Sequence, residues 1–210
     1  MTKSDKNKSS FNIFIVGKDF VGLTAFCYKL RTGKFNPCLP FNIGIDWYKM
    51  VIEMKEGKKI DFRIYDTKGH ERFRNMTRIH FKRADGIILM YSINSKESFD
   101  DLENWTRILK EENSFEIPIY LLGNKNDLER VITIEQGEKF AEKYGFIFSE
   151  CSVKNDSWDK IKSIFEELAK VVYEVSLGND KSKIIDQLNM KIKEKRYHTK
   201  LKILIKYLSL

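Results

Sequence analysis

Cysteine and long apolar runs are both scarce in this chain of 210 residues. The three cysteines show no metal-ligand spacing and are too few for a disulfide framework, so we expect reduced thiols in a cytosolic protein. No apolar run approaches the length of a membrane span. The first ten residues are polar, so we expect no secretory signal. With 42% hydrophobic and 32% charged residues, the composition indicates a soluble domain with a full core and an appendage.

Acidic residues are scarce at one end of the chain. From Gly178 onward there are nine Lys or Arg and three Asp or Glu residues, so this segment carries most of the net charge of +8. The preceding part of the chain is nearly neutral. A basic segment on a neutral domain predicts an anionic membrane, an acidic protein or nucleic acid as its partner. We expect no nucleic acid, because no readout module is visible.

Apolar runs alternate with longer amphipathic stretches along most of the chain. The strands are expected at 11–17, 48–56, 58–66, 86–93, 117–125 and 145–152, and the second and third form an antiparallel hairpin around Gly57. Helices are expected after the first strand to about residue 31, and near 97–112, 134–144 and 157–175. The alternation predicts an α/β fold with a six-stranded, mostly parallel sheet and helices on both faces. We expect a domain at 11–176, a linker at 177–182 and a basic helical extension at 183–210.

The stretch GKDFVGLT, residues 17–24, has the spacing of a phosphate-binding loop between a strand and a helix. Backbone N–H groups of such a loop bind phosphate, and the hydroxyl of Thr24 would hold Mg²⁺. Leu23 stands where the motif has lysine, while Asp19 and Phe20 occupy positions that are usually small. An ordinary strand–turn–helix with chance glycines is the alternative for this segment alone. The binding residues expected here are Gly17, Lys18, Asp19, Val21, Gly22, Leu23, Thr24 and Ala25.

Three further motifs follow strands: YDTKGHERFR at 65–74, LLGNKNDL at 121–128 and CSVKN at 151–155. Ligands of parallel sheets bind at the carboxyl ends of the strands, so these motifs are expected to meet the phosphate loop. In this order, and together with NIGIDW, HFKRA and LMYSIN, they make the chain resemble small GTPases of the Ras superfamily. The likeness is strongest to Rab proteins and covers about residues 11–175.

The resemblance implies a P-loop small G domain that binds GTP or GDP with Mg²⁺. Asn124, Lys125 and Asp127 match the Asn-Lys-x-Asp motif, in which the carboxylate accepts two hydrogen bonds from guanine. Phe35 matches the aromatic residue that packs against the base. Leu128 is a further expected binding residue, and the loop that meets guanine O6 is matched by Ser152, Val153 and Lys154.

The metal and γ-phosphate end departs from the family pattern. Thr24, Asn42 and Asp66 are the implied metal-binding residues, and Asn42 replaces a threonine. Because the loop cation is also missing at Leu23, this end has lost charge that phosphoryl transfer needs.

The implied catalytic segment is Lys68, Gly69 and His70. Gly69 matches the glycine that reports the γ-phosphate, while His70 replaces a water-orienting glutamine and Lys68 replaces an alanine. Very slow or absent GTP hydrolysis is therefore expected. Lys68 either supplies the missing cation from the opposite wall or pairs with Asp19 and fills the γ-phosphate site.

The predicted partner surface agrees with the family pattern, whereas the C-terminal segment departs from it. Trp47, Tyr65 and His80 match three aromatic positions that contact effectors, although Tyr65 is as readily a half-buried structural residue. The last cysteine, Cys151, lies inside the domain, so no prenyl anchor is expected. An apolar stripe of roughly helical period is formed by Ile184, Ile185, Leu188, Ile192, Leu201, Ile203, Leu204, Tyr207 and Leu208.

Three roles are open for this basic amphipathic helix: contact with a membrane surface, packing on the domain, or binding to a partner. We expect a cytoplasmic protein, with peripheral membrane contact as one of these alternatives. Two functions fit the whole sequence. One is a slow GTP/GDP switch in vesicle trafficking, and the other is a pseudo-GTPase scaffold in a fixed GDP-bound or nucleotide-free state.

Overall fold

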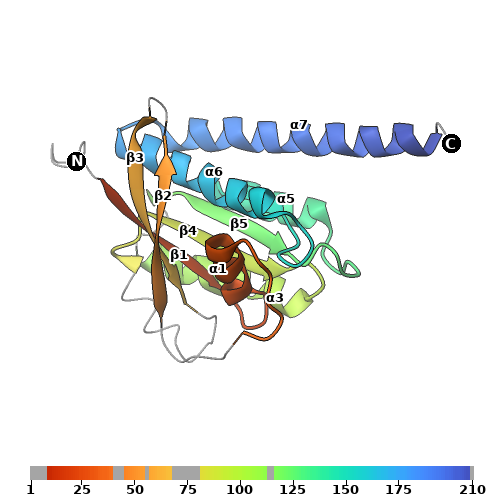
Figure 1. Ribbon diagram of the computed structural model, residues 1–210, viewed down its shortest axis with the longest axis horizontal. Helices are drawn as coiled ribbons and strands as arrows, with labels where there is room; N and C mark the ends of the chain where they lie inside the picture. The colour runs from red at the N-terminus through yellow and green to blue at the C-terminus, as the bar shows by residue number, and fades with distance from the viewer. Residues whose placement is uncertain (1–8, 40–44, 55–56, 68–80, 113–115, 209–210) are drawn as a thin grey trace.

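The computed structural model describes residues 9–39, 45–54, 57–67, 81–112 and 116–208, without the side chains of residues 200 and 202–208 (Figure 1). Its elements in chain order are β1 (Ser10–Gly17), α1 (Leu23–Thr32), β2 (Asp46–Glu53), β3 (Lys59–Asp66), β4 (Gly86–Ser92), α3 (Lys96–Asp100), α4 (Leu102–Glu111), β5 (Ile119–Asn124), α5 (Ile134–Tyr144), β6 (Ile147–Glu150), α6 (Trp158–Ser176) and α7 (Lys181–Leu208).

The six strands form one sheet in the order β2-β3-β1-β4-β5-β6. Strand β2 pairs antiparallel with β3, and the other pairs are parallel. The predicted six-stranded, mostly parallel sheet is thereby confirmed. One helical pattern is divided, because Asp101 separates α3 from α4 where a single helix was expected near 97–112.

The central strands are buried on both faces, which explains their nearly continuous apolar sequences. In β1, Ile13 and Ile15 contribute to one core cluster, while Phe14 and Val16 contribute to the other. The first cluster includes side chains of α1 and α6, and the second includes side chains of α4 and α5. Alternation of period two within each strand therefore builds a core on each side of the sheet.

Helix α7 lies along α6 and the edge strand β6, and its end extends past the sheet (Figure 1). Asn189 meets the open edge of β6 with both ends of its amide. The N–H of Phe148 donates to Asn189 Oδ1 over 3.0 Å, and Asn189 Nδ2 donates to the carbonyl of Phe146 over 2.9 Å. Arg196 pairs with Glu138 and lies 5.6 Å over the Phe148 ring. The first half of α7 thus covers a strand edge that would otherwise offer unpaired backbone groups.

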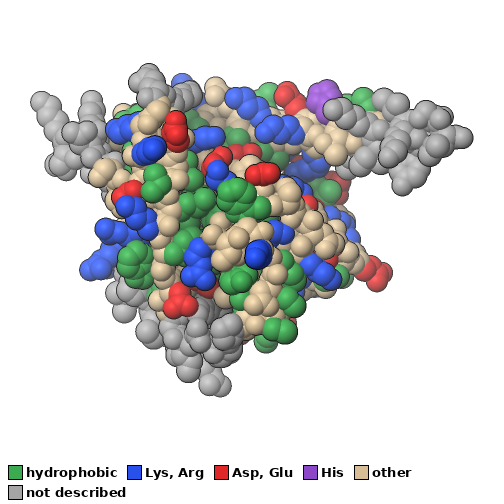
Figure 2. All heavy atoms as spheres, viewed as in Figure 1, with side chains coloured by type: hydrophobic (Ala, Val, Ile, Leu, Met, Phe, Trp, Pro, Cys, Tyr) green, Lys and Arg blue, Asp and Glu red, His purple; other side chains and the backbone are tan. Residues whose placement is uncertain are grey.

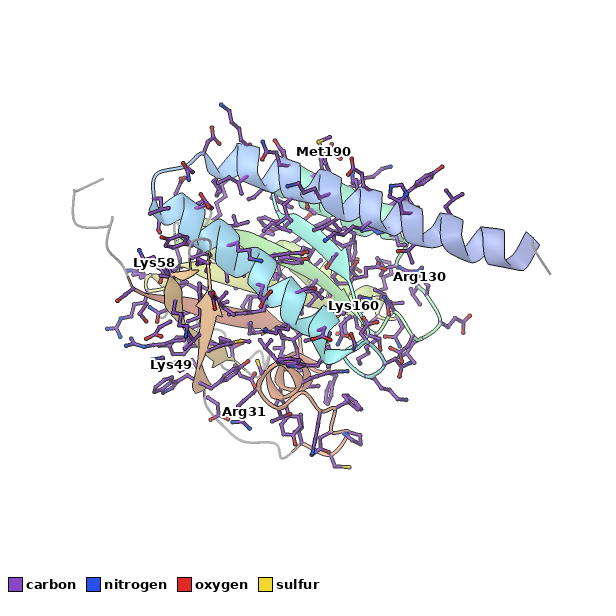
Figure 3. The ribbon with its side chains drawn as sticks, turned by 45° about the horizontal axis from the view of Figure 1, so that its top comes forward. Arg31, Lys49, Lys58, Arg130, Lys160 and Met190 are labelled. Atoms are coloured by element: carbon purple, nitrogen blue, oxygen red, sulfur yellow. The ribbon has the colours of Figure 1, made fainter. Side chains whose placement is uncertain are left out.

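The apolar stripe expected in this segment serves two surfaces. Ile185 is buried, and Ile184, Leu188 and Ile192 pack against the core cluster of α1 and α6, so the packing alternative holds for this half. The exposed large apolar side chains of α7 are Met190 and Tyr197, which lie outside the expected stripe, and Leu201, which belongs to it; this holds for the side chains that the structure describes. Figure 3 shows Met190 pointing away from the sheet.

Helix α7 begins at Lys181, inside the stretch expected to be a linker. The division into a domain at 11–176, a linker and an extension stays a prediction. Within the described ranges, no helix has both the length and the apolarity to cross a membrane.

Candidate functional site

Most residues that the sequence assigns to nucleotide binding line one cavity of about 720 Å³. It lies where the loop after β1, the start of α1 and the loops after β5 and β6 meet. Those predicted residues are Lys18, Asp19, Gly22, Leu23, Thr24, Ala25, Phe35, Asn124, Lys125, Asp127, Leu128, Val153 and Lys154. Motifs that lie more than a hundred residues apart in the chain therefore line a single cavity.

Two glycines let the phosphate loop lie close to its neighbours. A Cβ atom on Gly17 would stand 2.3 Å from the carbonyl oxygen of Met90 on β4. A Cβ atom on Gly22 would stand 2.5 Å from Asn124 Nδ2, and Gly22 has a φ of +104°, which favours glycine. The spacing of the motif thus has a steric basis in this fold, and the loop leads directly into the N-terminus of α1.

Asn124, at the end of β5, joins three loops of the site. Its Nδ2 donates to the carbonyl of Val21 over 2.8 Å, and its Oδ1 accepts from the N–H of Val153 over 3.0 Å. The buried thiol of Cys151 lies 3.7 Å from the same Oδ1, and burial raises its pKa, which keeps it protonated as a donor. Val21 supports the loop from the core and does not line the cavity. Asn124 is therefore primarily a brace for the site.

Lys125, the residue after Asn124, also contacts the phosphate loop. Its Nζ donates to the carbonyl of Phe20 over 2.6 Å. Burial lowers the pKa of the Lys125 ammonium, and the carboxylate of Asp127 partly offsets this effect. Lys125 and Phe20 are the two non-glycine residues with positive φ among those described, at 65° and 63°. That conformation costs an L-residue about 1–2 kcal/mol, so this contact stabilises a strained pair.

A buried lysine supports the site from beneath. Lys29 on α1 is 5% exposed, and its Nζ donates to the carbonyls of Val153 over 2.8 Å and Asp156 over 2.5 Å. The sequence reasoning missed this residue. The signal was its place between the buried positions Phe26 and Leu30 of α1, where a lysine needs a partner.

Among the described residues, the phosphate end of the cavity has an apolar side chain where the family motif has a lysine. Leu23 lines the cavity, yet it is 4% exposed and belongs to the core cluster with Val21 and Phe26. Asp19 adds an acidic group, whose buried Oδ1 has no hydrogen-bond partner within the described part of the chain. The residues thus fit the base and the backbone-bound part of a nucleotide, while the usual phosphate cation is replaced by an apolar side chain.

Several predicted residues lie beside the cavity or outside the description. Asp66 is buried at the end of β3, and Ser152 is buried with its hydroxyl accepting from the N–H of Asn155 over 2.9 Å. The predictions that fall outside the described residues concern Asn42, Lys68, Gly69, His70 and His80. The metal and catalytic roles assigned to them stay predictions.

The two described aromatic residues of the predicted partner surface have different surroundings. Trp47 on β2 is 60% exposed, and it is aligned with Tyr65 on β3. Tyr65 stacks on Phe14, with ring centroids 4.5 Å apart and planes 6° apart, and its hydroxyl donates to Asn12 Oδ1 over 3.4 Å. Tyr65 therefore has a structural role, and Trp47 is the more accessible of the two.

Four further residues line the cavity that the sequence did not assign to it: Phe20, Asn36, Pro37 and Leu39. The last three follow Phe35, whose match to the base-packing aromatic could have extended the prediction to its neighbours. Phe20 could have been found from its place in the phosphate loop, at a position that is usually small.

A mostly parallel sheet with a phosphate loop after β1 and an Asn-Lys-x-Asp loop after β5 defines a small guanine-nucleotide-binding domain. The chain belongs to the Ras family, whose model matches residues 12–174. It is similar to Ras-related protein SEC4 of Saccharomyces cerevisiae, with 36% identity over 82% of this chain and 83% of that protein. Human Ras-related protein Rab-8B is 37% identical over 76% and 77%, and human Rab-3A is 36% identical over 81% and 78%. The chain is thus a Rab-like small GTPase domain, a class whose ligands are GTP and GDP with Mg²⁺.

Proposed function

We propose that this chain binds guanine nucleotide and acts as a slow GTP/GDP switch in vesicle trafficking. The observation that carries the proposal is the preserved base end of the cavity. Asn124 braces three loops there, and Lys125, Asp127 and Phe35 line the same cavity. The likeness to Rab proteins supports the role in trafficking and in binding effectors through Trp47 and the segments near it.

In this proposal the residues divide into three groups, which contact the base, the metal and the γ-phosphate. Asp127 accepts hydrogen bonds from the guanine N1–H and amino groups, and the loop of Val153 and Lys154 meets the guanine O6. Thr24 and Asp66, with Asn42, would hold Mg²⁺. Lys68, Gly69 and His70 would contact the γ-phosphate and the attacking water, and the departure of Lys68 and His70 from the family pattern makes hydrolysis slow.

The missing lysine weakens phosphate binding without removing it. A hydrogen bond to a charged group contributes about 1.5–3 kcal/mol, so the leucine lowers affinity by about ten- to a hundred-fold. The backbone N–H donors of the loop do not depend on this side chain.

A second candidate function is a scaffold in a fixed GDP-bound or nucleotide-free state. Two observations favour it: Leu23 is part of the core, and Asp19 has a buried carboxylate oxygen at the phosphate end that has no hydrogen-bond partner among the described residues. A negative group in this position opposes a third phosphate more than a second one.

The test is the nucleotide content of the protein after purification without added nucleotide and subsequent denaturation. The slow switch predicts about one guanine nucleotide per chain, with a detectable share of GTP, and slow conversion of loaded GTP in a single turnover. GDP alone, with no uptake of a non-hydrolysable GTP analogue, would favour the fixed GDP-bound state. An empty protein that takes up no labelled GDP with Mg²⁺ would rule out both nucleotide-bound forms.

We further propose that the outer face of α7 contacts an anionic membrane. Met190 and Tyr197 are 62% and 66% exposed and lie seven residues apart, which places them on one side of the helix. Exposed Lys183 lies seven residues before Met190 on the same side, and exposed Lys193 lies beside this line, while Asp186 and Glu194 oppose the attraction. Figure 2 shows Lys and Arg side chains along α7 and near the β2–β3 hairpin. Apolar side chains between lysines suit a lipid surface with negative headgroups.

Flotation with phosphatidylcholine vesicles, with and without phosphatidylserine, tests this surface. The protein should float only with the anionic vesicles, and high salt should release it. A Met190→Glu/Tyr197→Glu variant should lose about tenfold or more in binding, because two apolar contacts are lost and two negative charges are added. The matched control, Val51→Glu/Val131→Glu, adds the same charge at exposed apolar sites outside α7. Equal binding of both variants would contradict the proposal.

A further inference from the structure

Phe20 combines two unfavourable features in one residue. It adopts the left-handed backbone conformation, with a φ of 63°, which L-residues with a side chain rarely occupy. Its aromatic side chain is 92% exposed, the largest exposed fraction among the large apolar residues described as exposed. A strained residue at a binding site is a reason to look for a function of the side chain that it carries.

The surrounding contacts fix Phe20 in this conformation. Lys125 Nζ donates to its carbonyl oxygen over 2.6 Å, and Asn124 Nδ2 donates to the carbonyl oxygen of the next residue, Val21, over 2.8 Å. Gly22 follows with its own positive φ and approaches Asn124 closely. The loop therefore cannot relax at Phe20 without breaking hydrogen bonds to the Asn-Lys-x-Asp segment, and the ring stays outside the core.

Phe20 lines the same cavity as Lys125 and Asp127, which are assigned to the base, and Phe35 lines it as well. A flat purine or a ribose presents faces that an aromatic ring can cover. Such contact would bury apolar surface of Phe20 that is otherwise exposed to water. Phosphate groups offer no such face. The chemistry of the ring therefore selects the nucleoside half of the ligand.

We propose that Phe20 is a nucleotide-contacting residue that covers the nucleoside part of bound guanine nucleotide at the mouth of the cavity and slows its dissociation. This inference rests on the proposed function, since it needs a nucleotide in the cavity. It offsets part of the affinity lost at Leu23 by contacts at the other end of the ligand.

The test compares the wild-type protein with Phe20→Gly and Phe20→Asn. Glycine and asparagine both tolerate a positive φ, so the loop and its bond to Lys125 are retained while the ring is removed. Stopped-flow release of labelled GDP in Mg²⁺ should be about tenfold faster in both variants. Calorimetry should show a less negative heat-capacity change of binding, because less apolar surface is buried. Val131→Ala, which trims an exposed apolar side chain that does not line the cavity, is the control and should release GDP at the wild-type rate.

Two results would overturn the inference, and they are distinguishable. If wild type and variants take up GDP, release it at equal rates and show the same heat-capacity change, the ring does not contact nucleotide. Higher melting temperatures of the variants in that case would show that Phe20 only adds strain, and loss of binding to a partner protein would assign the ring to that partner. If no protein of the set takes up GDP, the proposed function itself fails.

Discussion

Replacing Asn124 with alanine should have two effects: it should lower the free energy of unfolding by about 2–5 kcal/mol, and it should abolish nucleotide uptake. The substitution leaves the carbonyl of Val21 and the N–H of Val153 without the amide that joins them. Each buried backbone group left unpaired costs about 1–3 kcal/mol. Such a loss is a large share of the 5–15 kcal/mol that stabilises a typical domain. Because the same amide positions the phosphate loop, affinity for GDP should fall by at least about a hundredfold, or 2.7 kcal/mol.

Urea denaturation and uptake of labelled GDP measure the two effects on the same preparations. Asn126→Ala is the matched control, since Asn126 is the exposed asparagine two residues later in the same loop. It should retain the stability of the wild-type fold. An Asn124→Ala protein that unfolds at the wild-type urea concentration and still takes up GDP would show that the brace is dispensable.

Leu23→Lys should change stability in opposite directions depending on the nucleotide. Without nucleotide, the variant loses about 1.5–3 kcal/mol of apolar burial at a side chain that is now 4% exposed, and its ammonium must reach the cavity. With a non-hydrolysable GTP analogue and Mg²⁺, the ammonium gains a charge-assisted hydrogen bond. Affinity for the analogue should rise by about ten- to a hundred-fold.

Melting temperatures with and without the analogue test the predicted change in stability, and titration calorimetry tests the predicted gain in affinity. Leu23→Met keeps an apolar side chain of similar size and should show neither the loss nor the gain. If the lysine variant is destabilised but binds the analogue no better, the cation is not what this cavity lacks. Asp19, which lines the same cavity with a buried Oδ1, would then be the next residue to replace.

The fold could be predicted from local sequence because each strand repeats a simple pattern. Ile13 and Phe14 alternate between the two core clusters, and the same alternation continues through the parallel strands. The cavity was predictable because its motifs stand at strand ends, which the topology brings to one edge of the sheet. Both inferences depend on periodicity and spacing, which a single sequence contains.

The features that escaped prediction depend on single residues with distant partners. Lys29 and Asn189 are polar residues in helices, and only the fold shows that one meets the loop around Val153 and the other meets β6. The conformation of Phe20 likewise follows from Lys125, which lies 105 residues away. A local pattern can show that such a residue needs a partner, as at Lys29, but it does not record which distant group the partner is.

The docking of α7 also determines what the end of the chain can reach. A helix of 28 residues is about 42 Å long, and its first half is fixed to β6 and α6. Because α7 is a continuous helix fixed at one end, its second half points in one direction relative to the domain. A flexible segment of equal length would sample many directions. Anything held at the far end of α7 would therefore stand at a set distance from the nucleotide cavity, and would present the G domain to its surroundings in one orientation.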